Sequence, residues 1–177
     1  PLAAAYAAEV RQAYAGRAAL LAAEVINLSR DVLITGDDLA YEAACGLPTI
    51  RAPSCTMGLH VIMMYGGAMS VSHARVEKCG QRGVRGKYCL HWHLLGRCPE
   101  CAFVGNAVEH GHQRGIVVHG THEARVAHNV LSDVRGAGLY VEDGNELHNT
   151  FAHNVVVCPW DREGPLRSCT VPGTDNH

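Results

Sequence analysis

The stretch VSHARVEKCGQRGV at residues 71–84 returns in altered form as FVGNAVEHGHQRGI at residues 103–116. The two copies match at Val76 and Val108, and both carry Gln-Arg-Gly near their ends. Self-similarity at a period of about 20 to 50 residues is typical of folds made of stacked repeats, in which each unit buries its apolar face against the next. The stretch therefore predicts a solenoid.

The repeat continues toward the C-terminus at a shorter spacing. Asn106 recurs as Asn129 after 23 residues, and VAHN at residues 126–129 recurs as FAHN at residues 151–154. A unit near 23 residues, lengthened by an insertion around residues 94–101, fits the coil of a parallel β-helix. Short β-branched strands between Gly, Asn or Asp corners favour this fold over leucine-rich or helical solenoids.

Asparagine recurs at one corner of three successive coils. This residue type tolerates left-handed backbone geometry, and stacked amides can bond to one another between coils. We therefore expect an asparagine ladder formed by Asn106, Asn129 and Asn154.

The chain divides into three parts in this reading. We expect an all-β, right-handed parallel β-helix over residues 25–160, with loop insertions near residues 39–58 and 94–101. Residues 161–177 are expected to form an irregular tail. The alanine-rich residues 1–24 are predicted to be helical or irregular, because alanine has the highest helix propensity. The early β-strands are expected at residues 25–28, 32–35 and 59–64.

The amino-acid composition indicates a folded chain and argues against several classes of protein. The 177 residues are 47% hydrophobic and 18% charged, which fits a folded chain. A net charge of −2 with only two lysines argues against nucleic-acid binding. No apolar run reaches the roughly 20 residues that a membrane helix needs. Any signal peptide or membrane anchor is therefore expected in parts of the parent protein outside this chain.

Eight cysteines suggest disulfides and an oxidising, extracellular or cell-surface location. The pair Cys98 and Cys101 has the spacing of zinc ligands, but a second such pair is missing, so disulfides are favoured and their connectivity is open. Asn27-Leu28-Ser29 is a sequon for N-glycosylation, placed here in an expected strand.

The candidate site is identified from the way side chains alternate between the two faces of a β-strand. The strands LHWH at residues 90–93, IVVH at 116–119 and LYVE at 139–142 are expected to stack in three successive coils. Successive side chains of a strand point to opposite faces, so apolar residues fill the core while every second residue faces outward. Two outward columns result: His93, His119 and Glu142 in one, and His91, Val117 and Tyr140 in the other.

Because stacked strands lie about 4.8 Å apart, two imidazoles and a carboxylate in one column can hold a metal ion or transfer protons. The expected metal is zinc or calcium, with the candidate ligands His91, His93, His119 and His122. The candidate catalytic residues are Glu142, His119, His93 and Asp143. His110 and His112 pair with Asp133 and Arg135 in the 23-residue repeat and are expected to form a polar corner ladder instead.

Several segments together resemble a known family. They are GKYCLHWHL at 86–94, IVVHGTH at 116–122, HNV at 128–130 and VEDGNE at 141–146, preceded by AEVINLSRDVLITG at 23–36. In this order they resemble the β-helix region shared by the cell-migration-inducing hyaluronan-binding and hyaluronidase proteins and the fibrocystin-like ectodomains. The chain departs from the pattern at Ala137, where a histidine is expected, and at Cys89, where a proline is expected.

The resemblance implies a right-handed parallel β-helix, an extracellular or cell-surface location, and interaction with hyaluronan or a related polysaccharide. It also implies a site role for the matching positions His91, His93, His119, His122, Glu142 and Asp143. Two functions follow. One is a glycosidase-type hydrolase that uses Glu142 with Asp133 or Asp143; the other is a non-catalytic ectodomain module that binds its glycan or protein partner without turnover.

Overall fold

The computed structural model describes residues 10–14, 17–21, 25–36, 58–82, 84–159 and 168–169. These residues contain fifteen β-strands. No helix in this part of the chain is long and apolar enough to cross a membrane.

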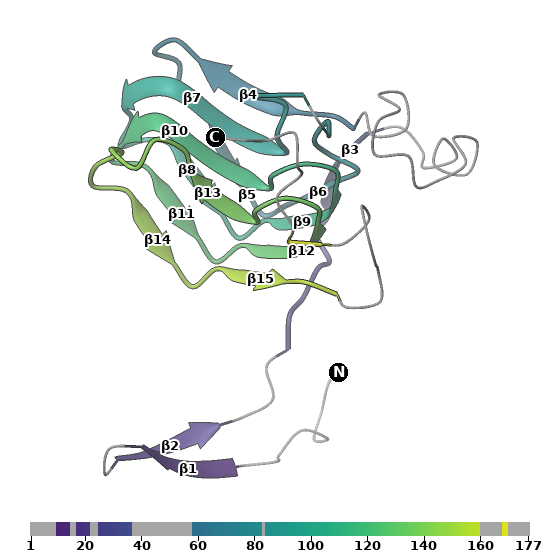
Figure 1. The fold of residues 1–177 in the computed structure, drawn as a ribbon, viewed down its shortest axis with the longest axis vertical. Helices are drawn as coiled ribbons and strands as arrows, with labels where there is room; N and C mark the ends of the chain where they lie inside the picture. Colours follow the sequence, from purple (N-terminus) through teal and green to yellow (C-terminus); the bar gives the residue numbers. More distant parts are fainter. Residues whose placement is uncertain are drawn as a thin grey trace, which may run out of the picture.

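Three parallel sheets wind around a common core (Figure 1). The first sheet contains β4 (Val61–Met64), β7 (Leu90–Arg97), β10 (Ile116–His122) and β13 (Leu139–Val141). The second sheet contains β5 (Ser70–Ser72), β8 (Ala102–Val104), β11 (Arg125–Ala127) and β14 (Thr150–Ala152). The third sheet contains β3 (Val32–Thr35), β6 (Ala74–Glu77), β9 (Ala107–Gly111), β12 (Val130–Val134) and β15 (Val155–Val157).

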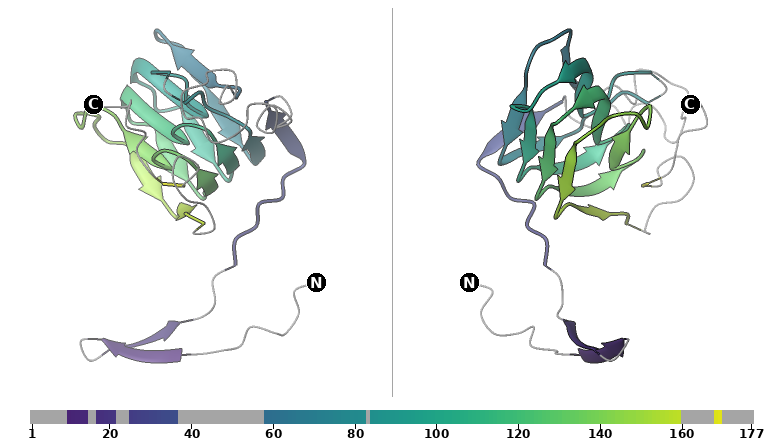
Figure 2. Two further views of the ribbon diagram at one scale, coloured as in Figure 1. Left: turned by 45° about the vertical axis from the view of Figure 1, so that its right-hand side comes forward. Right: turned by 90° about the vertical axis from the view of Figure 1, so that its left-hand side faces the viewer.

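The chain visits the three sheets in turn, so each full coil contributes one strand to each sheet. Four coils follow one another, from β4 to β6, β7 to β9, β10 to β12 and β13 to β15. Figure 2 shows the strands of successive coils lying side by side from two further directions. The predicted parallel β-helix is confirmed.

The coils stack in the register that the repeats predict. Val71 pairs with Phe103, and Val76 pairs with Val108, as the two copies of the first repeat require. Val126 likewise pairs with Phe151 in the last two coils. Each sequence match therefore marks two residues that lie one above the other in adjacent coils.

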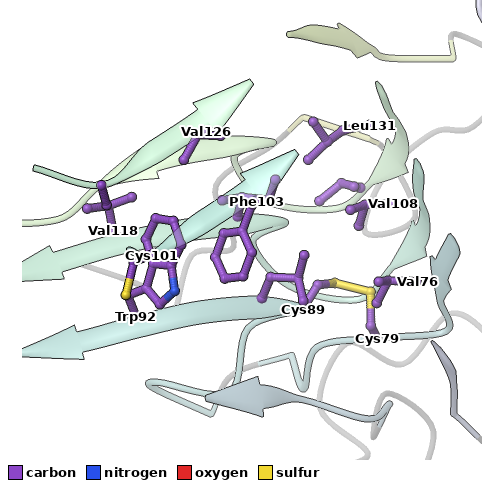
Figure 3. Close-up of a cluster of buried hydrophobic side chains, with 14 of the residues drawn as sticks. Val76, Cys79, Cys89, Trp92, Cys101, Phe103, Val108, Val118, Val126 and Leu131 are labelled. Carbon is purple, nitrogen blue, oxygen red and sulfur yellow. A yellow bond between two sulfur atoms is a disulfide. The ribbon is translucent and has the colours of Figure 1, made fainter. Parts of the chain in front are cut away.

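The core between the sheets is apolar and closely packed (Figure 3). Trp92 of the first sheet stacks face to face on Phe103 of the second, with ring centroids 3.9 Å apart. The indole Nε1 of Trp92 donates to the carbonyl oxygen of Met69 at 3.0 Å, so its one polar group is satisfied inside the core. The Cys79–Cys89 disulfide lies at the other end of this cluster.

The predicted asparagine ladder is present at the corner between the second and third sheets. Asn106 Nδ2 donates to Asn129 Oδ1 at 3.0 Å, and Asn129 Nδ2 donates to Asn154 Oδ1 at 2.9 Å. The backbone N–H of Asn106 and of Asn129 donates to the same amide oxygens of the next coil. The left-handed geometry falls on the preceding residues, Gly105, His128 and His153, and not on the asparagines themselves.

The N-terminal part differs from the sequence prediction. Val10–Tyr14 (β1) and Arg17–Leu21 (β2) form an antiparallel pair, so the helix expected in residues 1–24 is wrong for these segments. Pairing of backbone groups between two short strands outweighs the helix propensity of alanine here. The strand expected at residues 25–28 is also absent, and Asn27 of the sequon is exposed outside any strand. The strand expected at residues 32–35 is β3.

Two expected irregular regions lie mostly outside the described residues. Of the insertion near residues 39–58 only Gly58 is described, and of the tail at 161–177 only Ser168 and Cys169. Ser168 Oγ donates to the carboxylate of buried Asp133, and the N–H of Cys169 donates to the carbonyl oxygen of Val134. These two residues therefore attach the tail to β12.

Every cysteine in the described part of the chain is in a disulfide. The pairs are Cys79–Cys89, Cys98–Cys101 and Cys158–Cys169. Cys98 and Cys101 bond to each other across a tight turn, so the disulfide interpretation is confirmed for them and the zinc alternative is not supported.

The coil that begins with β7 is longer than the one that follows. The pairing of β7 with β10 shifts between His119 and Thr121, where Leu94 adopts a positive φ of 57°. The Cys98–Cys101 turn adds further residues before β8 begins at Ala102. Both irregularities come after His93. The first four residues of β7, 90–93, therefore pair with β10 in an unbroken register.

We predict that Asn129→Ala lowers the free energy of unfolding by about 2 to 3 kcal/mol, because it leaves buried polar groups of two neighbouring coils without partners. Asn129 is fully buried and bonds to Asn106, Phe103 and Asn154. Urea unfolding followed by circular dichroism measures the change. Asn145→Ala, at an exposed loop position, is the control. Equal unfolding midpoints for the two variants would contradict a stabilising ladder.

Candidate functional site

The outward columns of the first sheet have the predicted register. His93 of β7 pairs with His119 of β10, and His91 pairs with Val117. Val117 then pairs with Tyr140 of β13, and the N–H of Glu142 donates to the carbonyl oxygen of Val118, which places Glu142 beside His119. The alternation of apolar and polar residues in three short strands thus brings two imidazoles and a carboxylate together on the outer face.

His91 lies deeper than the sequence suggests. The expectation placed it outward with His93, but only 1% of its surface is exposed, because the segment leading into β7 covers it. His91 Nδ1 donates to the carbonyl oxygen of Gly86 at 3.1 Å, and the ring of Tyr88 lies 4.8 Å away between centroids. The prediction that His91 faces solvent beside His93 is therefore corrected: His91 is buried.

Three imidazoles converge at this point of the first sheet. The Nδ1 atoms of His93 and His119 are 2.9 Å apart. One nitrogen of each ring of His91, His93 and His119 lies within 4.8 Å of the others. His122 is not part of this group, and its Nδ1 accepts a hydrogen bond from the N–H of Leu147. The structure thus brings together three of the four predicted metal ligands.

His119 lies between two carboxylates. Its Nδ1 is 3.5 Å from Glu142 Oε2, and its Nε2 is 3.1 Å from Asp143 Oδ2. The side chain of Glu142 is 11% exposed and that of Asp143 is 45% exposed, so one carboxylate is sheltered and the other is open to solvent. All four predicted catalytic residues therefore lie in one cluster, with His93 beside His119.

Two residues that the sequence analysis missed hold Glu142 in place. Arg114, 3% exposed, donates to the hydroxyl oxygen of Tyr88 at 2.8 Å, and that hydroxyl donates to Glu142 Oε1 at 3.4 Å. The guanidinium carbon of Arg114 lies 3.9 Å from the centroid of the Tyr140 ring, within range of a cation–π interaction. The Gln-Arg-Gly tripeptide that recurs at residues 81–83 and 113–115 was the available indication, since a buried arginine needs a partner.

The environment favours the neutral form of His91 and of His93 by lowering the pKa of both imidazoles. Burial is the main cause that lowers the pKa of His91 to about 4, and His93 and His119 add to the effect. Burial also lowers the pKa of His93, with His119 as the next cause. Neutral imidazole is the form that donates a lone pair to a metal or accepts a proton.

One pair of the polar ladder expected elsewhere, His110 and Asp133, is in contact. His110 Nδ1 lies 3.0 Å from Asp133 Oδ2 across adjacent coils of the third sheet. Both residues have positive φ and occupy equivalent positions near the ends of β9 and β12. This pair lies on a different sheet from the histidine cluster and contributes to the stacking of the coils.

Comparison with known proteins identifies the family. The family model described as CEMIP beta-helix matches residues 56–169. The chain belongs to this family. The matched residues include all four coils of the solenoid and every member of the cluster around His119.

Several curated proteins are similar to this CEMIP-type β-helix. Fibrocystin-L of Mus musculus is 34% identical over 88 residues, which are 49% of this chain and 2% of that protein. Protein rliB of Dictyostelium discoideum is 30% identical over 133 residues, or 75% of this chain and 11% of that protein. Communication mutant protein F of the same organism is 27% identical over 132 residues. The chain therefore spans a small part of these relatives. No solved structure is significantly similar to it.

Disulfides and family membership agree on location. Three disulfides in the described residues require an oxidising compartment. Together with the similarity to Fibrocystin-L and the CEMIP β-helix family, they indicate an extracellular or cell-surface β-helix module.

We predict that Tyr88→Phe lowers the free energy of unfolding by about 2 kcal/mol, because buried Arg114 loses a hydrogen-bond acceptor. Urea unfolding measures the difference. Tyr140→Phe is the matched control, since it keeps the aromatic ring against Arg114 and should leave stability unchanged. A Tyr88→Phe variant as stable as the control would show that the hydroxyl contact does not hold Arg114.

Proposed function

We propose that this β-helix module binds hyaluronan or a related polysaccharide across the outer face of the first sheet and hydrolyses it at the His119–Glu142 pair. The substrate class rests on the CEMIP β-helix family and on the hyaluronan-binding proteins that the sequence resembles. A flat face of parallel strands offers an extended surface along which a linear polymer can lie.

The observation that carries the proposal is the environment of Glu142. Tyr88 and Arg114 fix its Oε1 from one side, while its Oε2 is buried and has no hydrogen-bond partner among the described residues. That oxygen lies 3.5 Å from His119 Nδ1. A carboxylate oriented by two groups and left with one oxygen beside an imidazole is arranged for proton transfer.

Hydrolysis of a glycosidic bond requires two proton transfers. The leaving glycosidic oxygen takes up a proton, and the attacking water gives one up, so that water is added across the broken bond. His119 is in contact with both Glu142 and Asp143 and can pass a proton between them. In this scheme Glu142 is the sheltered carboxyl group, Asp143 is its solvent-exposed counterpart, and His93 supports the ring of His119.

The competing function is a non-catalytic ectodomain module. Ala137, where the family resemblance leads one to expect a histidine, favours this alternative. Its carbonyl oxygen accepts a hydrogen bond from the N–H of Gly115, so it sits at the corner adjacent to Arg114. A methyl group there supplies no proton donor or acceptor. Binding of the polysaccharide without cleavage is the outcome that this alternative predicts.

We expect the full 177-residue chain to bind fluorescent hyaluronan and to shorten it, as measured by fluorescence anisotropy and gel electrophoresis. Glu142→Gln should slow cleavage about 100-fold or more, the range typical of losing a general acid or base, while binding persists. Glu100→Gln, an exposed position in the turn before the second sheet, is the control and should cleave normally.

Each part of the proposal fails on a different result. Wild-type protein that binds hyaluronan but leaves its length unchanged identifies the non-catalytic module. Cleavage by Glu142→Gln at the wild-type rate removes the role of this carboxylate. Wild-type protein that binds neither hyaluronan nor chondroitin rules out the polysaccharide function of this face.

A further inference from the structure

One nitrogen in the histidine cluster is buried and unused. His91 is 1% exposed, and its Nε2 has no hydrogen-bond partner among the residues that the structure describes. The other nitrogen, Nδ1, faces the carbonyl oxygen of Gly86 at 3.1 Å. A carbonyl oxygen can only accept, so the ring proton is on Nδ1 and Nε2 presents a free lone pair. The tautomer of His91 is thereby fixed by the backbone.

The ring of His119 is oriented in the same way by a different group. Its Nε2 lies 3.1 Å from Asp143 Oδ2, and this carboxylate favours a proton on Nε2. The lone pair of His119 is then on Nδ1, which faces Nδ1 of His93 at 2.9 Å. A partner that holds the remote nitrogen of an imidazole is the usual companion of a metal-bound histidine.

The spacing of the three rings fits one small cation. Two imidazole nitrogens bound tetrahedrally at about 2.0 to 2.1 Å from zinc lie roughly 3.3 Å apart. The His93–His119 nitrogens are 2.9 Å apart, and the nitrogens of all three rings lie within 4.8 Å of one another. Binding one ion therefore requires side-chain rotations that bring separations of up to 4.8 Å to roughly 3.3 Å.

We propose that His91, His93 and His119 bind one zinc ion on the outer face of the first sheet. This inference goes beyond polysaccharide binding and does not depend on it. Zinc on His119 Nδ1 would occupy the lone pair that the proposed proton transfer uses, so the two proposals describe alternative states of the site. Of the two metals expected from the sequence, zinc fits, because calcium takes six to eight oxygen ligands and this cluster offers nitrogens. His122, whose Nδ1 bonds to the backbone of Leu147, is not a ligand.

Three protein ligands leave one position of a tetrahedral zinc open. Structural zinc sites are closed by four protein ligands, whereas sites with three keep a place for water or substrate. The buried Oε2 of Glu142, which has no hydrogen-bond partner among the described residues, lies 3.5 Å from His119 Nδ1. The site would therefore have the ligand number of a catalytic zinc centre, with a carboxylate beside one of the ligands.

The burial of His91 explains why the ion would be retained. Two ligands come from one strand, at alternate positions 91 and 93, and the third from the adjacent coil, so the β-helix itself sets the distance between them. Tyr88 covers the deepest ligand, His91, whereas His93 and His119 are partly exposed, with 19% of the His119 side chain exposed. A cluster of imidazoles that the fold already holds together loses less conformational freedom when it binds a cation.

The test is zinc titration of the metal-free 177-residue chain by calorimetry and by competition with a fluorescent chelator, with no glycan present. We expect one zinc ion per chain for the wild type. His119→Ala should lose this stoichiometric binding. His128→Ala is the matched control, because His128 is an exposed histidine of the second-to-third-sheet corner whose ring stacks on His153, and it should bind like the wild type.

A second variant keeps the test informative if His119→Ala fails to fold. Asp143 is 45% exposed, so Asp143→Asn preserves the fold while weakening the contact that orients His119. We expect its zinc affinity to fall by about 10- to 100-fold. X-ray absorption of the wild-type complex should show three nitrogen neighbours at about 2.0 Å and one further light atom.

Two outcomes overturn the site. The first is a wild-type chain that binds less than one equivalent of zinc. The second is zinc binding that His128→Ala removes and that His119→Ala and Asp143→Asn leave unchanged. Because the titration contains no polysaccharide, zinc binding can fail while hyaluronan binding succeeds, and the reverse, so the two proposals are separable.

Discussion

The hydrogen bonds between stacked coils are the constraint on which the rest of this structure depends. Adjacent parallel strands lie about 4.8 Å apart, and a slip of one residue would turn every side chain of a strand to the opposite face. The Asn106–Asn129–Asn154 ladder fixes the register at one corner of the stacked coils. Trp92 stacked on Phe103 packs the core within one coil. No coil buries its apolar face alone, so register and stability arise together.

The histidine cluster is a direct consequence of this register. When Leu90 and Ile116 pair inside the core, His93 and His119 must pair outside it. The fold therefore supplies the distance between the rings, and local groups supply their orientation: a backbone carbonyl for His91 and a carboxylate for His119. Precise positioning of this kind on regular strands is what a metal or proton-transfer site requires.

The sequence predicts the solenoid and the outward columns because both follow from spacing and alternation, which are local patterns. It does not predict that His91 is covered or that Tyr88 and Arg114 orient Glu142, because those contacts depend on the path of the chain between strands. The helix expected in the alanine-rich N-terminal residues is wrong for another reason. Helix propensity is a weak preference, and residues 10–14 and 17–21 pair as strands instead.

The most direct test of the account is the contact between histidine rings of adjacent coils in solution. In metal-free protein labelled at histidine, nuclear Overhauser spectroscopy should detect ring protons of His93 close to those of His119, because the ring centroids lie 4.7 Å apart. His91 should also contact His93, at 5.2 Å. Absence of the His93–His119 contact, with His93 instead close to core side chains, would contradict the register and with it the site.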